Sequence, residues 1–313
     1  MNVGVVARPG MTRERAAAVA LVLVACTSPQ IGAAFAVTLF DELGPAGAAF
    51  LRLIIAAIVL WLIWRPHLAG DLRLAAAFGV SLGLMNWTFY EAISRIPLAI
   101  AVTIEFAGPL LVAVVGSRRP LDVVWVGLAA IGIVLLVNPG GGSLDPVGVG
   151  FALAAAGCWM AYIYLSKRTG AAFPGGAGLA IAMAVGALVV LPAGALRAST
   201  AFAEPELLGT ALIVALASSV LPYSLELVAL RRLPAAVFGV LMSLDPAVAA
   251  VVGFIALHQD LGPREVLAIA MVVVASAGAA SLSHRPERPN DDGVGDRQQR
   301  TGPQPQHEPQ EAR

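Results

Sequence analysis

The chain has 313 residues, of which 58% are hydrophobic and 13% are charged, and its mean hydropathy is +0.81. A soluble domain carries about a quarter charged residues, so this composition excludes an ordinary soluble domain and indicates several membrane crossings. The 20 basic and 20 acidic residues leave no net charge, and this balance points to no nucleic acid partner.

Long apolar runs follow one another along the chain. A helix needs about 20 mostly apolar residues to cross a bilayer. Short links rich in turn residues, such as Gly44-Pro45 and Arg65-Pro66, separate the runs and leave no room for a soluble domain. The sequence therefore predicts an all-α integral membrane protein with ten transmembrane helices. They are expected near 15–38, 46–64, 73–92, 96–117, 121–138, 146–166, 176–196, 206–230, 234–257 and 263–283.

The basic residues of the links predict the orientation of these helices. Cytoplasmic loops of membrane proteins carry an excess of Lys and Arg. With both termini in the cytoplasm, thirteen basic residues of the links and helix ends lie inside and three lie outside. The inner set is Arg8, Arg13, Arg15, Arg65, Arg73, Arg118, Arg119, Lys167, Arg168, Arg231, Arg232, Arg285 and Arg288, and the outer set is Arg95, Arg197 and Arg264.

One segment of the chain occurs twice. The stretch 97–109 begins and ends with proline and contains Glu105, and the stretch 234–246 repeats both prolines and contains Asp245. Chance similarity between Ala- and Val-rich helices is the alternative to a true duplication. Halves of five helices each have opposite orientations because five is odd, and such inverted repeats place a substrate site near the midplane.

This organisation predicts the boundaries of five regions. The tail has almost no large apolar residues and is expected to be disordered. The regions are a cytoplasmic N-terminus (1–14), a first five-helix repeat (15–138), a linker (139–145), a second five-helix repeat (146–283) and a cytoplasmic tail (284–313).

Five charged residues lie inside the predicted helices: Arg52, Glu91, Glu105, Glu226 and Asp245. Such a charge costs about 2.5–3.5 kcal/mol at the bilayer centre, and intramembrane charges commonly mark functional sites. Glu105 and Asp245 are closest to the middle of their helices. Glu91 lies near an outer helix end and Glu226 near an inner one, where Glu226 has Arg231 and Arg232 as alternative ion-pair partners.

Glu105 is the strongest candidate among them. Pro109 follows four residues later and cannot donate a hydrogen bond to the Glu105 carbonyl, so a free carbonyl lies beside a buried carboxyl group. A substrate ammonium or a transported proton fits this pairing. The alternative is a neutral acid bonded to a neighbouring helix. Asp245, directly before Pro246, is open to the same two interpretations.

Arg52 and several neutral groups complete the candidate site. Arg52 either holds a substrate carboxylate, pairs with Glu91, or reaches outward to a lipid phosphate. Polar and helix-breaking residues add a plausible cavity lining. They are Gln30, Asn86 and Tyr223, with expected helix breaks at Pro29, Pro109 and Pro246.

Several catalytic and binding motifs are missing from the sequence. There is no Walker motif, no His-Glu-x-x-His and no Gly-x-Ser-x-Gly. The two cysteines fall inside apolar runs and are expected to be packing residues. We therefore expect no metal, no cofactor and no enzymatic activity. A membrane-embedded enzyme acting on lipid-linked substrates is the alternative from another class, but it needs a cluster of acids or His that is not seen.

Five motifs carry a resemblance to a known family: Gly79–Asn86, Ile100–Pro109, Ser117–Asp122, Leu221–Glu226 and Phe238–Ser243. They resemble the EamA type of the drug/metabolite transporter superfamily, and the resemblance covers about residues 12–283. It implies a secondary active exporter of threonine, homoserine or similar small amino acids in the bacterial inner membrane, driven by proton entry. Export of another small metabolite or a toxic amphipath is the alternative, and a homodimer is open.

The resemblance also bears on individual positions. Gln30, Arg52, Asn86, Glu105, Tyr223 and Glu226 match the amino-acid exporters of the family. Three positions depart from them, namely Val37 in place of lysine, Glu91 in place of a neutral residue, and Asp245 in place of glutamate. The working hypothesis is alternating access, in which Glu105 binds the amine or exchanges a proton and Arg52 attracts the carboxylate.

Overall fold

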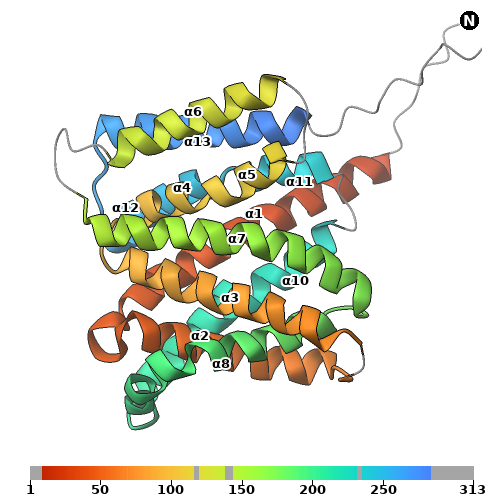
Figure 1. The fold of residues 1–313 in the computed structure, drawn as a ribbon, viewed down its shortest axis with the longest axis vertical. Coiled ribbons are helices and arrows are strands. Elements are labelled where there is room, and N and C mark those ends of the chain that lie inside the picture. The colour runs from red at the N-terminus through yellow and green to blue at the C-terminus, as the bar shows by residue number, and fades with distance from the viewer. Residues whose placement is uncertain (1–8, 69, 116–119, 138–143, 231–234, 283–313) are drawn as a thin grey trace, which may run out of the picture.

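The computed structural model describes residues 9–68, 70–115, 120–137, 144–230 and 235–282, and every regular element within these ranges is helical (Figure 1). The elements are α1 (Pro9–Val37), α2 (Phe40–Trp64), α3 (Leu72–Ile93), α4 (Leu98–Glu105), α5 (Ala107–Val115), α6 (Pro120–Val137), α7 (Pro146–Ala172), α8 (Ala177–Ala198), the 3-10 helix η1 (Ser199–Phe202), α9 (Pro205–Ala215), the π-helix η2 (Leu216–Val220), α10 (Leu221–Leu230), α11 (Ala235–Met242), α12 (Asp245–Leu257) and α13 (Pro263–Leu282).

Each predicted apolar run falls on one helix or on consecutive helices. By length and composition, seven stretches of the described residues are apolar enough to cross a membrane, so the structure is that of an all-helical, multi-pass membrane protein. These stretches are Val19–Val37, Phe40–Trp64, Pro146–Ala172, Ala177–Phe202, Pro205–Glu226, Val237–Leu257 and Pro263–Ala280, and shorter apolar helices cover Leu98–Val112 and Val123–Val137.

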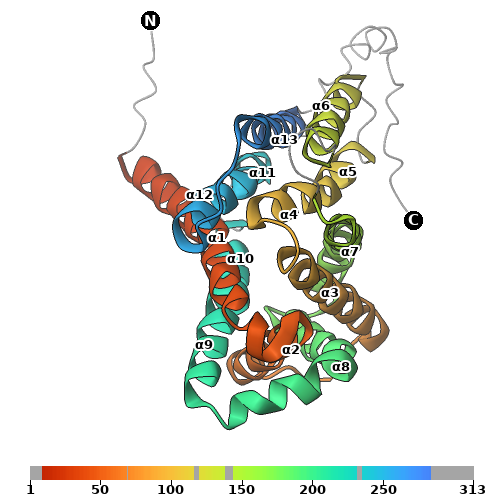
Figure 2. The same cartoon turned by 90° about the vertical axis from the view of Figure 1, so that its left-hand side faces the viewer.

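The helices run side by side along one direction (Figure 1). Seen along that direction, α1, α9 and α10 form one side and α3 and α7 the other (Figure 2). At one end of this outline α2 packs against α8, and at the other end α6 packs against α13. Between them, α1 contacts α10 and α12, and α7 contacts α3, α4 and α5.

Two pairs of short helices are interrupted near a proline. α4 and α5 are separated at Phe106, and α11 and α12 are separated at residues 243–244. Pro109 and Pro246 lie in the first turn of the helix that follows each break, where the missing proline N–H has no helical partner to lose. The expected break at Pro29 is wrong, because α1 continues through it from Pro9 to Val37.

Local sequence accounts for several helix ends. The side chain of Asp71 caps α3 by accepting a hydrogen bond from the Leu74 N–H at 3.1 Å. Asp145 caps α7 in the same way, accepting from the Val147 N–H at 2.9 Å, and Pro146 occupies the first helical position. α2 begins earlier than predicted because a helical turn precedes a kink at Gly44, whose φ is 66°, and the helix continues beyond it.

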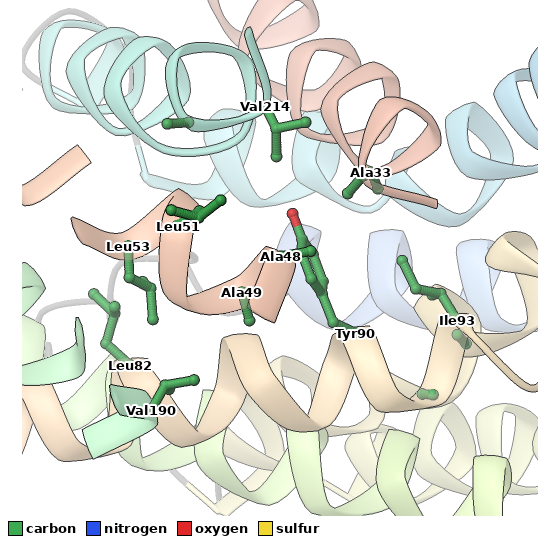
Figure 3. Packing of buried hydrophobic residues seen from close by; sticks show 14 of the residues in the cluster. Ala33, Ala48, Ala49, Leu51, Leu53, Leu82, Tyr90, Ile93, Val190 and Val214 are labelled. Carbon is green, nitrogen blue, oxygen red and sulfur yellow. The ribbon is translucent and has the colours of Figure 1, made fainter. Parts of the chain in front are cut away.

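The core consists of close contacts between helices that carry small residues. Leu53 of α2, Leu82 of α3 and Val190 of α8 are fully buried where these helices meet (Figure 3). At the contact between α3 and α8, a Cβ atom placed on Gly83 would lie 2.7 Å from the carbonyl oxygen of Gly186. Small residues at such crossings let helix backbones approach closely in membranes. This packing holds α3 at the position from which its polar residues reach the interior.

Candidate functional site

A cavity of about 650 Å³ lies within the bundle, lined by residues from α1, α2, α3, α4, α5, α7, η2, α10, α11, α12 and α13. All the predicted polar site residues reach it, together with Pro29 and Pro109. Pro246 is buried beside Asp245 without lining the cavity. The polar residues brought together are Gln30, Arg52, Asn86, Glu105, Tyr223, Glu226 and Asp245.

Arg52 is a buried cation in the wall of this cavity, with 6% of its surface exposed. Its Nε donates to the Ser219 Oγ at 3.0 Å, and its Nη2 donates to the Ser218 carbonyl at 2.7 Å. Nη1 lies 3.4 Å from the Tyr90 hydroxyl, and the guanidinium sits 5.4 Å from the centre of the Tyr90 ring. The guanidinium is thus fixed by neutral groups, and no carboxylate of a described residue forms an ion pair with it.

The π-helix η2 explains how the Ser218 carbonyl becomes available to Arg52. Pro222 lies four residues after Ser218 and has no N–H to donate to that carbonyl. The preceding carbonyl, of Ala217, accepts a hydrogen bond from the Ser28 hydroxyl of α1 at 2.6 Å. The wide turn thus presents backbone acceptors to α1 and α2, as π-bulges at functional sites often do.

Two of the alternatives predicted for Arg52 are wrong. Glu91 instead pairs at 2.6 Å with Arg95, which lies just past the end of α3, and accepts a hydrogen bond from Trp87 Nε1 at 3.1 Å. Residues four apart on a helix face each other, so the nearer arginine takes this carboxylate. Outward extension of Arg52 to lipid is excluded by its burial and by its three contacts inside the bundle.

Three acids from different helices face the same cavity: Glu105 of α4, Glu226 of α10 and Asp245 of α12. None forms an ion pair with a described residue; Arg231 and Arg232, the alternative partners of Glu226, lie outside the described residues. Asp245 is an electrostatic neighbour of both glutamates, and Glu105 also interacts with Arg52.

Asp245 carries a further sign of an incomplete site, because its Oδ1 is buried without a hydrogen-bond partner in the described structure. Three ionised carboxylates against one guanidinium would leave two excess negative charges around a cavity inside the bundle. Buried charge of this kind is costly unless a cation or a proton compensates for it. The cavity is therefore suited to bind a positively charged group or to take up protons.

Aromatic rings form much of the remaining wall. Tyr162 of α7 faces Tyr223 of α10 with ring centres 6.2 Å apart, and Phe106 meets Trp159 edge-on at 5.3 Å. The hydroxyl and carbonyl partners of Arg52 were not predicted from the sequence. The pair Ser218-Ser219 shortly before Pro222 was the available signal, since a proline frees the carbonyl four residues earlier.

Comparison with known proteins shows the family of the chain. Residues 146–280 match the EamA-like transporter family. The threonine/homoserine exporter RhtA of Escherichia coli (strain K12) is 43% identical over 267 residues, which are 83% of this chain and 90% of that protein. Its counterpart in Salmonella typhimurium (strain LT2) is 41% identical over 285 residues, or 88% and 96% of the two chains.

The chain belongs to the EamA-like transporter family. The family predicted from the five motifs is thereby confirmed, and the chain is a transporter rather than a membrane-embedded enzyme. A crystal structure of another protein shares the fold, with a TM-score of 0.53 and 19% sequence identity. The match covers 84% of this chain and 96% of the other.

Proposed function

We propose that this EamA transporter exports small amino acids of the threonine and homoserine class across the bacterial inner membrane. The curated relatives that match most of its length are named threonine/homoserine exporters. The observation that carries the proposal is the charge arrangement of the cavity, where one fixed guanidinium and three carboxyl groups face the same space. A zwitterion presents a carboxylate and an ammonium, which are the two complementary groups.

The cavity residues divide between these two groups. Arg52 would receive the substrate carboxylate, because guanidinium and carboxylate groups form strong paired hydrogen bonds. Glu105 would bind the ammonium or take up and release the transported proton. Gln30, Asn86 and Tyr223 add neutral donors and acceptors around the bound molecule.

Proton entry is proposed as the driving reaction. Asp245 has a buried oxygen without a partner and lies in electrostatic contact with Glu105 and Glu226. A proton that moves onto this acidic group compensates for the negative charge that a departing ammonium leaves behind. Substrate and proton would then occupy the cavity alternately, which is the requirement for exchange.

The proposed architecture is ten membrane crossings arranged as two inverted repeats, 15–138 and 146–283. Support comes from the helix breaks, because α11 begins and ends 137 residues after α4. Exchange of the two halves also leaves the main helix contacts in place. The contacts of α1 with α10 and α12 correspond to the contacts of α7 with α3 and α5. The contact between α2 and α8 and the contact between α6 and α13 are each unchanged when the halves are exchanged.

The contact between α4 and α12 departs from this symmetry and supports alternating access. α4 packs against α12 at one end of the bundle, whereas α5 and α11, which occupy the other end, have no comparable contact (Figure 1). At the packed end, the Gln259 side chain accepts a hydrogen bond from the Leu98 N–H at 3.0 Å. Since α4 follows the predicted outer link, we propose a state that is closed outside and open toward the cytoplasm.

A disulfide across the packed end tests this mechanism. A Cβ atom on Gly253 would lie 3.8 Å from the Leu98 Cβ, which matches the mean Cβ separation of a disulfide. In a chain with Cys26 and Cys158 replaced by alanine, Leu98→Cys with Gly253→Cys should stop transport on oxidation and recover on reduction. The single variants are the controls. Full transport by the oxidised double variant would contradict alternating access through this end.

Export itself is tested with labelled threonine and homoserine in loaded cells, with and without the chain. Faster efflux from expressing cells is expected, and equal efflux would contradict the proposal. The size of the cavity keeps a second candidate open, since small-molecule sites of about 300–1,000 Å³ hold drug-sized ligands. Together with the aromatic wall, this favours an amphipathic metabolite as the alternative substrate, and efflux of such compounds without amino-acid efflux would select it.

A further inference from the structure

Arg52 belongs to α2, but the groups that fix it belong largely to η2. The Ser219 hydroxyl and the Ser218 carbonyl hold Nε and Nη2, and the Tyr90 hydroxyl of α3 faces Nη1. Ser219 is fully buried and does not line the cavity. It therefore influences the cavity only by orienting the Arg52 side chain.

The remaining hydrogen-bonding capacity of Arg52 is limited and directional. A guanidinium has five N–H donors, and the three contacts above use one each on Nε, Nη1 and Nη2. One N–H therefore remains on each terminal nitrogen. Two parallel N–H donors match the two oxygens of a carboxylate, whereas an amide or an alcohol offers at most one acceptor with the same geometry.

We infer that η2 is a positioning device that makes Arg52 a fixed two-donor receptor for a carboxylate, with Ser219 as the residue that sets the orientation of the guanidinium. This inference rests on the proposed export of amino acids and assigns the source of their recognition to a particular buried hydroxyl. Pro222 and the wide π turn supply the second acceptor, the Ser218 carbonyl. Selectivity for free amino acids over their neutral derivatives is the consequence.

A purely structural role makes a different prediction. If the contacts of Arg52 only join α2 to η2, their loss should weaken the fold and reduce the transport of every substrate by a similar factor. If they orient the guanidinium, their loss should affect substrates that carry a carboxylate and spare those that do not. The comparison between two kinds of substrate therefore separates the two roles.

The test uses the full chain in proteoliposomes, with concentration-dependent uptake of labelled threonine and competition by unlabelled threonine, threonine amide and threoninol. For Ser219→Ala, the KM for threonine should rise about tenfold, as expected for a lost hydrogen bond to a charged group. Its kcat and the inhibition by threonine amide and threoninol should stay close to wild type. Ser219→Thr, which keeps the hydroxyl, should restore the low KM.

Two further variants keep the test decisive. Tyr90→Phe keeps the ring and removes the hydroxyl near Nη1, so it should raise the KM for threonine in the same selective way even if Ser219 variants fold poorly. Thr210→Ala is the matched control, because the Thr210 hydroxyl donates to the Glu206 carbonyl of its own helix, α9, at 3.0 Å and Thr210 does not line the cavity.

The outcomes separate this inference from the proposed function. If Ser219→Ala and Tyr90→Phe weaken the binding of threonine, threonine amide and threoninol by equal factors, the positioning role is overturned. Threonine transport by the wild-type chain would still support the proposed function in that case. Selective loss for threonine supports the inference. A wild-type chain that moves neither threonine nor homoserine would overturn the proposed function and the carboxylate receptor with it.

Discussion

Replacement of Glu105 by glutamine removes one negative charge and leaves the size of the side chain unchanged. Glu105 is 8% exposed, lines the cavity, and has no ion-pair partner among the described residues. A bound ammonium would therefore find in this carboxylate a counter-charge that no described residue already holds in an ion pair. We predict that Glu105→Gln weakens threonine binding strongly and leaves folding intact.

The size of the effect follows from the burial of this site. Two opposite charges about 4 Å apart attract by about 4 kcal/mol at an effective dielectric constant near 20. The amide oxygen of glutamine still accepts a hydrogen bond, which recovers about 1 kcal/mol. The net loss of about 3 kcal/mol corresponds to a rise of roughly 100-fold in the apparent KM.

Concentration-dependent uptake of labelled threonine into proteoliposomes measures this change. Glu206→Gln, which alters an exposed acid in the first turn of α9, is the matched control and should behave as wild type. Amounts of folded protein are compared by size-exclusion chromatography. A Glu105→Gln chain with wild-type KM and wild-type flux at every pH would refute the reasoning about this residue.

Three other predictions address packing, coupling and topology. Gly83→Ala should lower the free energy of unfolding by about 1–3 kcal/mol through overpacking, because its Cβ would lie 2.7 Å from the Gly186 carbonyl oxygen. Gly157→Ala is the control and should not lower it, because a Cβ at this position meets open space. Thermal melting in detergent measures both variants, and equal melting temperatures would contradict the packing. Asp245→Asn should abolish flux driven by a pH gradient and retain threonine–threonine exchange, since an amide carries no exchangeable proton of this kind; gradient-driven flux at the wild-type rate would exclude Asp245 from coupling. Single cysteines at the exposed positions Ser94 and Thr200 should react with an impermeant maleimide in intact cells. A single cysteine at the exposed position His67 should react only after permeabilisation. The reverse pattern would contradict the predicted orientation.

Much of the fold could be predicted because apolar length and proline position act locally. The run 96–117 and its repeat 234–257 predicted the regions where α4, α5, α11 and α12 are found, with an interruption near Pro109 and Pro246. The break expected at Pro29 does not occur, because its effect depends on the surrounding helices. Neighbouring helices hold α1 in a continuous helix, so the loss of one backbone hydrogen bond does not break it.

The candidate site was predictable by residue type and less so by partner. Burial costs alone identified Arg52, Glu105 and Asp245, because charges are rarely placed inside membrane helices without a purpose. The partners of Arg52 depend on the π turn of η2, which lies more than 160 residues away in the chain. Such a contact is set by the tertiary packing of α2 against η2, and periodicity along the sequence holds no information about it.

The exchange of amino acid for protons through this cavity is tested most directly by proteoliposomes loaded with labelled threonine and diluted into acidic medium. We expect the gradient, acidic outside, to accelerate threonine efflux from wild-type proteoliposomes and to acidify their interior at the same time. Both effects should be lost in Glu105→Gln. Efflux no faster than from protein-free liposomes, or efflux at the same rate with and without the gradient, would contradict it.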